Sequence, residues 1–557
     1  MKNYSSVNVK VQKKSGFDKS FQNLFTSKVG TITPILCDEL IPNSTVYLKA
    51  AISAALPPLA SDTFMRCKLK YAAFFVPTRI IMPGFEKWLL NNDAVLDEDK
   101  VRVPQLEFPS SYLNSTTAED QKLRVKTLGP GSLADYLGFK ITEADIKRNV
   151  QTGEPGYRYN LSFNALPFLA YHRIYNDWFR NSLVQTDIYD DVATTSYAPA
   201  TSNSVIPTEA NGYKIQFDPT DQSFMYNDGV DVWSLRQANF GYDIYTTASP
   251  QAQNGKAQAV TMTKIENQDG FTISALRAAN SMQQFLERNN LAGNRLVDFV
   301  RAQYGAHLSD SIAQRPILLG KGSFDVYSKG IYQTTPDDPA SGGTSSVNPF
   351  NSVGARYGSA YADGTDMLVN NFTTAEPGYL MVLAWLSPKV TYSTGIDPML
   401  TRYLNNSVSD MANPILQNVG NEPLYINQLS MYGLDEGTVT DKVFGYIERY
   451  GNWKDKQDEV HGILRDTSSL QSFALQRSFS RETLPGISTK FLQIPTNYLD
   501  QVGAVSNSIS DYGYWCDTYF DYKVSMPLAQ YSVPSLQDPA YEHGVDVTVN
   551  KSGTSLS

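Results

Sequence analysis

Histidine, the side chain most often used for proton transfer and metal binding, is scarce in this sequence of 557 residues. Its four histidines are His172, His307, His461 and His543. None has the His-Glu-x-x-His spacing that turns two imidazoles toward one zinc ion, and no Gly-x-Ser-x-Gly elbow supports a serine nucleophile. His172 falls in an apolar helical pattern, where packing is the expected role. We therefore predict no enzymatic activity, no metal and no cofactor.

Two other patterns could bind a charged ligand, and both have a simpler interpretation. Gly320-Lys321-Gly322-Ser323 is similar to part of a phosphate-binding loop, but it lacks the Walker spacing and a following helical pattern. The acidic group Asp187, Asp190 and Asp191 could bind a cation, although a solvated surface is the favoured interpretation. No local motif selects a pair of carboxylates for glycoside hydrolysis.

Lysines concentrate in the first 28 residues. Six of them stand there against a single acid, Asp18, whereas the whole chain carries a net charge of −9. A solvated tail is one interpretation of this basic N-terminal arm, residues 1–28. The other is an arm that contacts nucleic-acid phosphates, for which Lys10, Lys13 and Lys14 are the first candidates.

The element around which the chain is organised is a helix predicted for Leu166 to Arg180. Pro167 suits its first turn, and aromatic and aliphatic residues recur at helical spacing over a broad face. A helix so rich in rings must be buried against something large. Patterns typical of strands lie on both sides of it, at Gly30 to Leu40, Thr45 to Ala54, Met65 to Val76, Gly378 to Tyr392, Leu424 to Leu429, Lys442 to Tyr450, Lys490 to Ile494 and Tyr514 to Val524.

One of these strands has two different parts. Apolar and basic residues alternate from Met65 to Tyr71, which places Arg66, Lys68 and Lys70 on one face. The pattern then becomes a continuous apolar run to Val76, as expected of a strand buried on both faces. The first part is therefore predicted to be half-buried, with a basic outer face.

Five further segments complete the expected organisation. A short helix is predicted after Pro83, and two further helices are predicted at Thr272 to Arg288 and at Arg295 to Tyr304. Residues 183–265 are polar, with nine acids against four bases, and are predicted to be an outward-facing insertion that carries its own strands. Residues 334–369 are rich in Gly, Ser and Asp and are predicted to be a long loop.

The composition agrees with a β-rich fold. The chain has 34 Tyr, 36 Gly and 29 Pro, and only 18% of its residues are charged. Three widely spaced cysteines argue against a disulfide framework, and no signal peptide or membrane span is expected. Because strands occur throughout the chain, we predict one β-sandwich domain, residues 29–557, with long insertions. The absence of a chemical motif favours a protein that makes surfaces.

Short blocks spread over most of the chain carry a resemblance to a known family. They are Gly30-Thr31-Ile32-Thr33-Pro34-Ile35 with Glu39-Leu40-Ile41-Pro42, Phe74-Phe75-Val76-Pro77-Thr78-Arg79, Leu166-Pro167-Phe168 through Tyr175-Asn176-Asp177-Trp178-Phe179-Arg180, Thr272 to Arg277 with Leu286-Glu287-Arg288, Tyr304-Gly305 with Gln314-Arg315-Pro316, and Gly445-Tyr446 with Arg449-Tyr450 and His461-Gly462. In order and spacing they resemble the major capsid proteins of the microviruses, small single-stranded DNA bacteriophages, and the gokushovirus-like groups in particular. The departures are Tyr304-Gly305 for the family's Phe-Gly, Pro42-Asn43-Ser44 for its Pro-Gly-Asp, and residues 183–265, which match poorly.

The resemblance implies a mainly β fold, an eight-stranded viral jelly-roll sandwich with long helix- and loop-containing insertions. It implies a virion protein, made in the bacterial host cytoplasm, whose copies form a small icosahedral shell around circular single-stranded DNA. The implied partners are further copies of the chain, the DNA, scaffolding and pilot proteins, a small DNA-binding peptide and a host-surface receptor. By position, residues 183–265 correspond to the family's surface protrusion and are the candidate for host recognition.

Two alternatives remain from the residues themselves. A glycan-binding or glycan-cleaving β-sandwich would suit the abundant Tyr and Trp and the acidic surface, but it predicts export. A cytoplasmic enzyme would need a clustered polar site that the sequence does not reveal.

Overall fold

The computed structural model describes most of the chain. The described residues are 6–61, 63–82, 85–91, 103–108, 118–141, 161–185, 214–215, 225–226, 230–251, 314–333, 356–403, 411–430, 442–465, 470–479, 484, 486–505, 507–530 and 544–550, with a few positions between 277 and 309. Within them no helix is long and apolar enough to cross a membrane.

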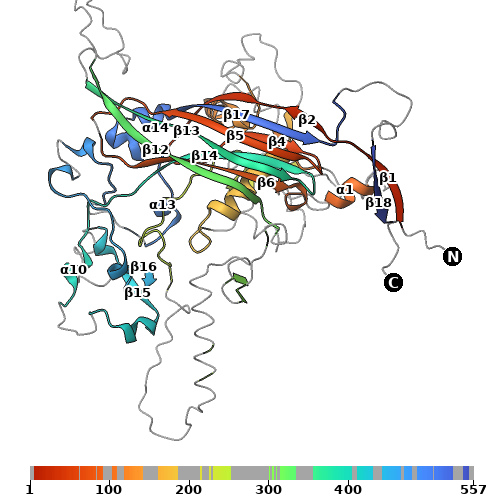
Figure 1. The fold of residues 1–557 in the computed structure, drawn as a ribbon. Coiled ribbons are helices and arrows are strands. Elements are labelled where there is room, and N and C mark those ends of the chain that lie inside the picture. Colours follow the sequence, from red (N-terminus) through yellow and green to blue (C-terminus); the bar gives the residue numbers. More distant parts are fainter. Residues whose placement is uncertain are drawn as a thin grey trace, which may run out of the picture.

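A nine-stranded antiparallel sheet forms the body of the molecule (Figure 1). Its order is β2-β17-β5-β13-β12-β6-β14-β4, and β3 also pairs with β17. The strands are β2 (Ser15–Asp18), β3 (Phe21–Ser27), β4 (Thr33–Leu40), β5 (Thr45–Ala55), β6 (Cys67–Pro77), β12 (Ile317–Gln333), β13 (Arg356–Thr373), β14 (Gly378–Pro388) and β17 (Tyr514–Met526). The predicted mainly β class is confirmed.

The sheet curls because one long strand serves two layers. The first part of β12, up to Val326, pairs with β6, whereas Tyr327 and later residues pair with β13. The far edges of the sheet then approach each other, and Asn23 Nδ2 of β3 donates to the Ile35 carbonyl of β4 at 2.8 Å. This arrangement agrees with a sandwich of the expected jelly-roll kind. Nine strands occur instead of eight because β2 and β3 follow each other along β17.

Strands β4, β6 and β14 form one layer, and strands β2, β3, β5, β13 and β17 form the second, with β12 shared between them. The first layer is largely covered on both faces, whereas the second is open on one face. In β14 every residue is buried except the half-buried Trp385, and β6 is buried throughout from Tyr71 to Pro77. In β17, by contrast, buried and exposed residues alternate over most of the strand. A strand with both faces covered needs a continuous apolar run, and a strand with one face in water needs alternation. Both patterns were readable in the sequence.

The covered layer lies under the predicted central helix. The helix comprises α6 (Leu166–Ile174), which contacts β6 and β14, and a π-helical turn, η5 (Tyr175–Phe179). Pro167 stands in the first turn, as predicted. Most of the side chains of α6 are buried, so the prediction of a buried organising helix is confirmed.

Two sequence predictions in the second layer and beside it are wrong. The loop predicted over residues 334–369 includes β13, whose Gly, Ser and Asp residues concealed its strand character. The strand predicted at Lys490 to Ile494 is instead a short helix, α13 (Thr489–Leu492), because the Ser488 hydroxyl caps it by accepting from the Phe491 N–H. Residues 334–355 lie outside the described residues.

Strand β12 was not predicted, and it contains Gly320-Lys321-Gly322-Ser323. A Cβ on Gly320 would lie 2.0 Å from the Leu368 carbonyl oxygen, and one on Gly322 would lie 2.2 Å from the Tyr71 hydroxyl. The glycines therefore allow close approach within the sandwich. This excludes a phosphate-binding loop at that position.

The first residues of the chain are paired rather than free. Strands β2 and β3 lie in the main sheet, so residues 15–27 are not a solvated tail. Strand β1 (Ser6–Gln12) pairs with β18 (Gly544–Asn550), so these two strands from opposite ends of the sequence lie side by side (Figure 1). The predicted boundary at residue 28 therefore falls after two strands of the main sheet.

The predicted insertion is not wholly outward-facing. Its described strands are β9 (Lys214–Ile215), β10 (Met225–Tyr226) and β11 (Val230–Asp231). Val232, Trp233 and Phe240, however, belong to the hydrophobic core. The prediction that the outward insertion extends to residue 265 is therefore wrong. Residues 186–213, and almost all of the helices predicted at 272–288 and 295–304, lie outside the described residues.

The remaining elements are short. The second half of the chain carries a lobe with β15, β16 and α10, which lies below the sheet in Figure 1. The bounds are η1 (Thr78–Ile80), α1 (Phe85–Asn91), β7 (Gln105–Phe108), α3 (Ala118–Leu128), α4 (Leu133–Tyr136), β8 (Leu161–Asn164), α10 (Pro398–Thr401), η7 (Pro414–Val419), β15 (Asn421–Tyr425), η8 (Ile426–Gln428), β16 (Val443–Glu448), α12 (Gly451–Lys454), η9 (Gly462–Leu464), η10 (Gln471–Phe473), η11 (Tyr498–Val502) and α14 (Ser508–Tyr512).

Candidate functional site

The central helix joins segments that are far apart in the chain. The Tyr171 hydroxyl donates to the Ile32 carbonyl at 2.7 Å and accepts from the Arg236 N–H at 2.8 Å. Trp178 Nε1 donates to the Pro316 carbonyl at 2.9 Å, just before β12 begins. Each of these bonds satisfies a polar group near the core that would otherwise be costly to bury. The helix therefore fixes the segments that lead into the sheet.

His172 has a structural role on this helix. Its Nε2 lies 2.7 Å from the Val232 carbonyl, and its Nδ1 accepts from Arg236 Nε at 3.2 Å. These contacts fit a neutral ring with its proton on Nε2. Burial, and after it the charge of Arg236, lower the pKa of His172 to about 3. The side chain is fully buried, so it cannot reach a substrate, in agreement with the packing role predicted from sequence.

The predicted DNA-contacting lysines lie together at the start of the chain. Lys10 is in β1, where its Cα stands opposite that of Asp546. Lys13 and Lys14 follow in the connection to β2 and are both exposed. Lys14 Nζ donates to Thr45 Oγ1 at 3.2 Å. The geometry leaves Lys13 and Lys14 accessible to a phosphate.

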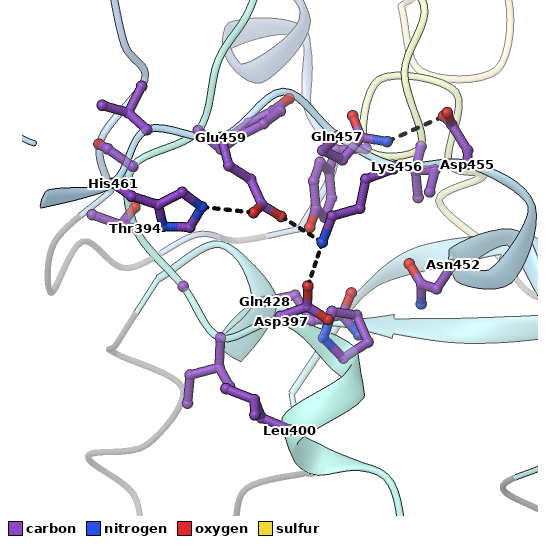
Figure 2. A pocket seen from close by; sticks show the side chains of 18 of the residues that line it. Thr394, Asp397, Leu400, Gln428, Asn452, Asp455, Lys456, Gln457, Glu459 and His461 are labelled. Carbon is purple, nitrogen blue, oxygen red and sulfur yellow. Dashed lines mark hydrogen bonds and ion pairs between the residues drawn. The ribbon is translucent and has the colours of Figure 1, made fainter. Parts of the chain in front are cut away.

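A charged pocket of about 300 Å³ lies in the lobe that follows β14 (Figure 2). Lys456 Nζ stands between two carboxylates, 2.6 Å from Asp397 and 3.1 Å from Glu459. His461 Nε2 lies 3.1 Å from Glu459. The hydrogen bond from Lys456 and the Met399 N–H hold the pKa of Asp397 below its usual value.

This arrangement is better suited to holding the lobe together than to catalysis. Because Lys456 pairs with both carboxylates, neither is placed as a free general acid or base. Among the described residues, no group of three or more His, Cys, Asp or Glu side chains is arranged to hold a metal ion. No sequence pattern points to the pocket, since its charged residues come from segments about 60 residues apart.

The open layer of the sheet presents aromatic side chains to its surroundings. Tyr361 of β13 and Trp515 of β17 both stand opposite Ala55 of β5, and Tyr327 of β12 stands opposite Tyr361. Directly opposed residues of antiparallel strands share a face. These three rings therefore form a row across four strands, and Tyr519 lies further along β17. Their exposed fractions range from 39% to 52%. Exposed rings of this kind are typical of protein contacts.

The lobe carries a second group of exposed apolar residues. In the half of the chain that follows β14, large side chains more than 45% exposed occur mainly in the lobe. Those in the lobe are Met399, Leu400, Tyr403, Met411, Ile415, Trp453 and Ile463. The Arg402 guanidinium lies 4.2 Å from the centre of the Trp453 ring, so this ring is both exposed and held in place. These exposed side chains are a second candidate for contacts with other molecules.

Comparison with known proteins gives a consistent result. A family model described as "Capsid protein (F protein)" matches residues 5–129 and 262–536. The capsid protein VP1 of Chlamydia phage 1 is 23% identical over 96% of this chain and 98% of its own length. The capsid protein VP1 of Bdellovibrio phage phiMH2K is 24% identical over 94% and 95%, and that of Spiroplasma virus 4 is 24% identical over 91% of each. Because the family model covers well over half of the chain, the protein belongs to the capsid protein (F protein) family, which confirms the resemblance to microvirus capsid proteins.

Proposed function

We propose that this protein is the major capsid subunit of a small icosahedral virion and that its copies enclose a circular single-stranded DNA genome. The observation that carries the proposal is the family match over residues 5–129 and 262–536. We infer a structural role without catalysis, in agreement with the fully buried His172 and the carboxylates paired by Lys456. A glycan-binding role is not favoured.

The open surfaces supply contacts for assembly. A closed shell needs several different contacts per subunit, and large rings carry much of the energy of such contacts. The aromatic row on the sheet and the apolar residues of the lobe are two separate candidates on one chain. Two patches on different parts of a subunit allow it to bind neighbours in more than one direction.

The DNA-contacting role of Lys10, Lys13 and Lys14 remains a proposal. It is supported by the excess of lysine at residues 1–28 and by the exposure of Lys13 and Lys14. We also propose that the undescribed part of residues 183–265 forms the surface protrusion that recognises a host receptor. Scaffolding and pilot proteins and a small DNA-binding peptide are the other proposed partners, and the host cytoplasm is the proposed place of synthesis.

The capsid role is tested by producing the full chain in bacteria, sedimenting it and imaging the fast fraction by electron microscopy. We expect uniform closed shells a few tens of nanometres across, either alone or when scaffolding proteins are produced with the chain. If the protein stays a slow monomer in both cases and binds a carbohydrate array saturably, the capsid role is wrong.

The arm is tested with a double variant, Lys13→Gln and Lys14→Gln, because deletion of the arm would also remove β1 and its pairing with β18. The matched control is Lys490→Gln, which replaces an exposed lysine outside the arm. We expect packaged DNA to be released at lower salt from the double variant only. Equal salt sensitivity in the two would contradict the arm's role.

The protrusion is tested by exchanging residues 186–213 with the corresponding segment of a relative. The exchange stops before the buried residues Val232 and Trp233, so the core is left intact. We expect adsorption to follow the donor of the segment. Unchanged adsorption by correctly assembled virions would remove the segment from host recognition.

A further inference from the structure

A hollow of about 950 Å³ opens at the point where the central helix stops covering β6. Phe74 of β6 lies under the helix, and its ring centre is 5.7 Å from that of Trp178. Lys70 and Lys68 lie on the same face of the strand, four and six residues earlier. The exposed Arg66 precedes them, outside the helix cover. All three basic residues line the hollow.

The hollow is positively charged in an acidic protein. Its lining includes four basic residues, Arg66, Lys68, Lys70 and Lys389, against one acid, Asp325. The whole chain has a net charge of −9, so this local excess is the reverse of the average. An anion could enter without meeting the general repulsion of the surface.

The counter-charges near the hollow do not neutralise it. Asp325 stands opposite Lys68 at 3.5 Å, and both side chains are more than half exposed, so their attraction is weak. Lys389 pairs with Asp458. Lys70 forms no ion pair with any described residue, and burial, together with the charge of Lys68, lowers its pKa. A bound anion would relieve the repulsion between these lysines.

Two aromatic rings stand beside the positive charges. Phe64 is 76% exposed and Tyr327 is 49% exposed, and both line the hollow. A phenylalanine so exposed gains little by packing within its own chain. Rings next to a positively charged groove are the combination that holds single-stranded nucleic acid, because bases stack on the rings and phosphates meet the cations.

We propose that this hollow binds a short stretch of single-stranded DNA, with phosphates at Arg66, Lys68 and Lys70 and a base stacked on Phe64. The inference rests on the proposed function, which supplies the DNA. It adds a site distinct from the lysines of the N-terminal arm. An acidic protein segment would use the cations but leave Phe64 without a planar partner.

The test measures binding of a fluorescently labelled oligothymidylate to the full-length protein by anisotropy at several salt concentrations. In the double variant Arg66→Gln and Lys68→Gln, the slope of log affinity against log salt should become shallower by about 1.4, or about 0.7 for each phosphate that is no longer neutralised. Phe64→Ala should weaken binding about tenfold at every salt concentration and leave the slope unchanged. Lys490→Gln is the control and should match the wild type.

Two outcomes would overturn the proposal. One is an unchanged slope in the double variant while the variant Lys13→Gln and Lys14→Gln shows the shallower slope instead, which would place the DNA on the arm alone. The other concerns competition for the labelled oligothymidylate. If oligoglutamate of equal charge competes as strongly as unlabelled oligothymidylate, an acidic protein segment is the ligand. Sedimentation of the same variants distinguishes this failure from failure of the capsid role. If the variants form normal shells and bind DNA like the wild type, the proposed DNA site in the hollow is wrong but the capsid role stands.

Discussion

The two ends of β6 share one backbone but differ in what covers them. At one end Phe74 lies under the rings of Trp178 and Phe179, and the strand is buried on both faces. At the other end the same face carries Arg66, Lys68 and Lys70. The strand geometry is continuous, so the difference comes from where the helix ends. The covered end contributes to folding, and the open end is available to other molecules.

The same contrast separates the two layers of the sheet. Residues of β14 are buried on both faces, whereas β17 keeps one face open with Trp515 and Tyr519. Substitutions in the covered layer should therefore change the free energy of unfolding of the subunit. Substitutions in the open layer should change its associations.

The largest effect on the free energy of unfolding is expected from Phe74→Ala. Removing a buried ring deletes its packing and leaves a cavity, so this free energy should fall by about 3–5 kcal/mol. Tyr519→Ala is the matched control, since it removes a half-exposed ring from the open layer and should cost less than about 1 kcal/mol. Chemical denaturation of unassembled subunits measures both. Equal losses of unfolding free energy in the two variants would mean that burial under the helix does not make the covered layer more important for stability than the open layer.

A pH-dependent effect on the free energy of unfolding is expected from His172. Its pKa in the folded protein is about 3, below the value of about 6.5 in an unfolded chain, so protons bind the unfolded state more readily. Stability from this residue is complete above about pH 6.5 and is lost as pH falls toward 3, by at most about 1.4 kcal/mol per unit.

The measurement compares unfolding between pH 7 and pH 4 in the wild type and in His172→Gln. The variant should lose stability less steeply as pH falls. His461→Gln, which replaces a histidine that is 80% exposed in its side chain, is the control and should follow the wild type. Parallel curves for the wild type and His172→Gln would show that the buried imidazole does not contribute to the acid sensitivity.

The smallest effect on stability is expected in the open layer, where the effect on assembly should be largest. Tyr519→Ala should raise the protein concentration needed for shell formation by about tenfold, as expected for loss of one aromatic anchor in an interface. Light scattering during assembly measures this. Normal assembly at wild-type concentrations would show that this part of the sheet faces no neighbour.

Elements whose side-chain period matches their burial could be predicted from the sequence. Strands β4, β5, β6, β14 and β17 have clear apolar or alternating patterns, and the central helix has a proline in its first turn. Strands β12 and β13 were not predicted because they use Gly, Ser and Asp where backbones approach closely, as at Gly320 beside Leu368. Propensity alone cannot predict a strand that is stabilised by its neighbours in space.

The candidate sites were predicted only in part. The alternation at Arg66, Lys68 and Lys70 indicated a basic face, but Tyr327 and Lys389 reach the same hollow from β12 and from the end of β14. Their proximity depends on strand order, which no local pattern in the sequence encodes. For the same reason the pairing of Lys456 with Asp397 was not foreseen.

The most direct measurement is an electron cryomicroscopy reconstruction of DNA-filled shells. We predict that Phe74 and Trp178 are buried within one subunit, that Trp515 or Tyr519 contacts another subunit, and that density beyond the protein lies against Phe64 and Lys68. A reconstruction in which the open layer faces solvent on the outer surface and the hollow is empty would contradict this account. The account holds that the covered layer stabilises the subunit and that the open surfaces bind other molecules.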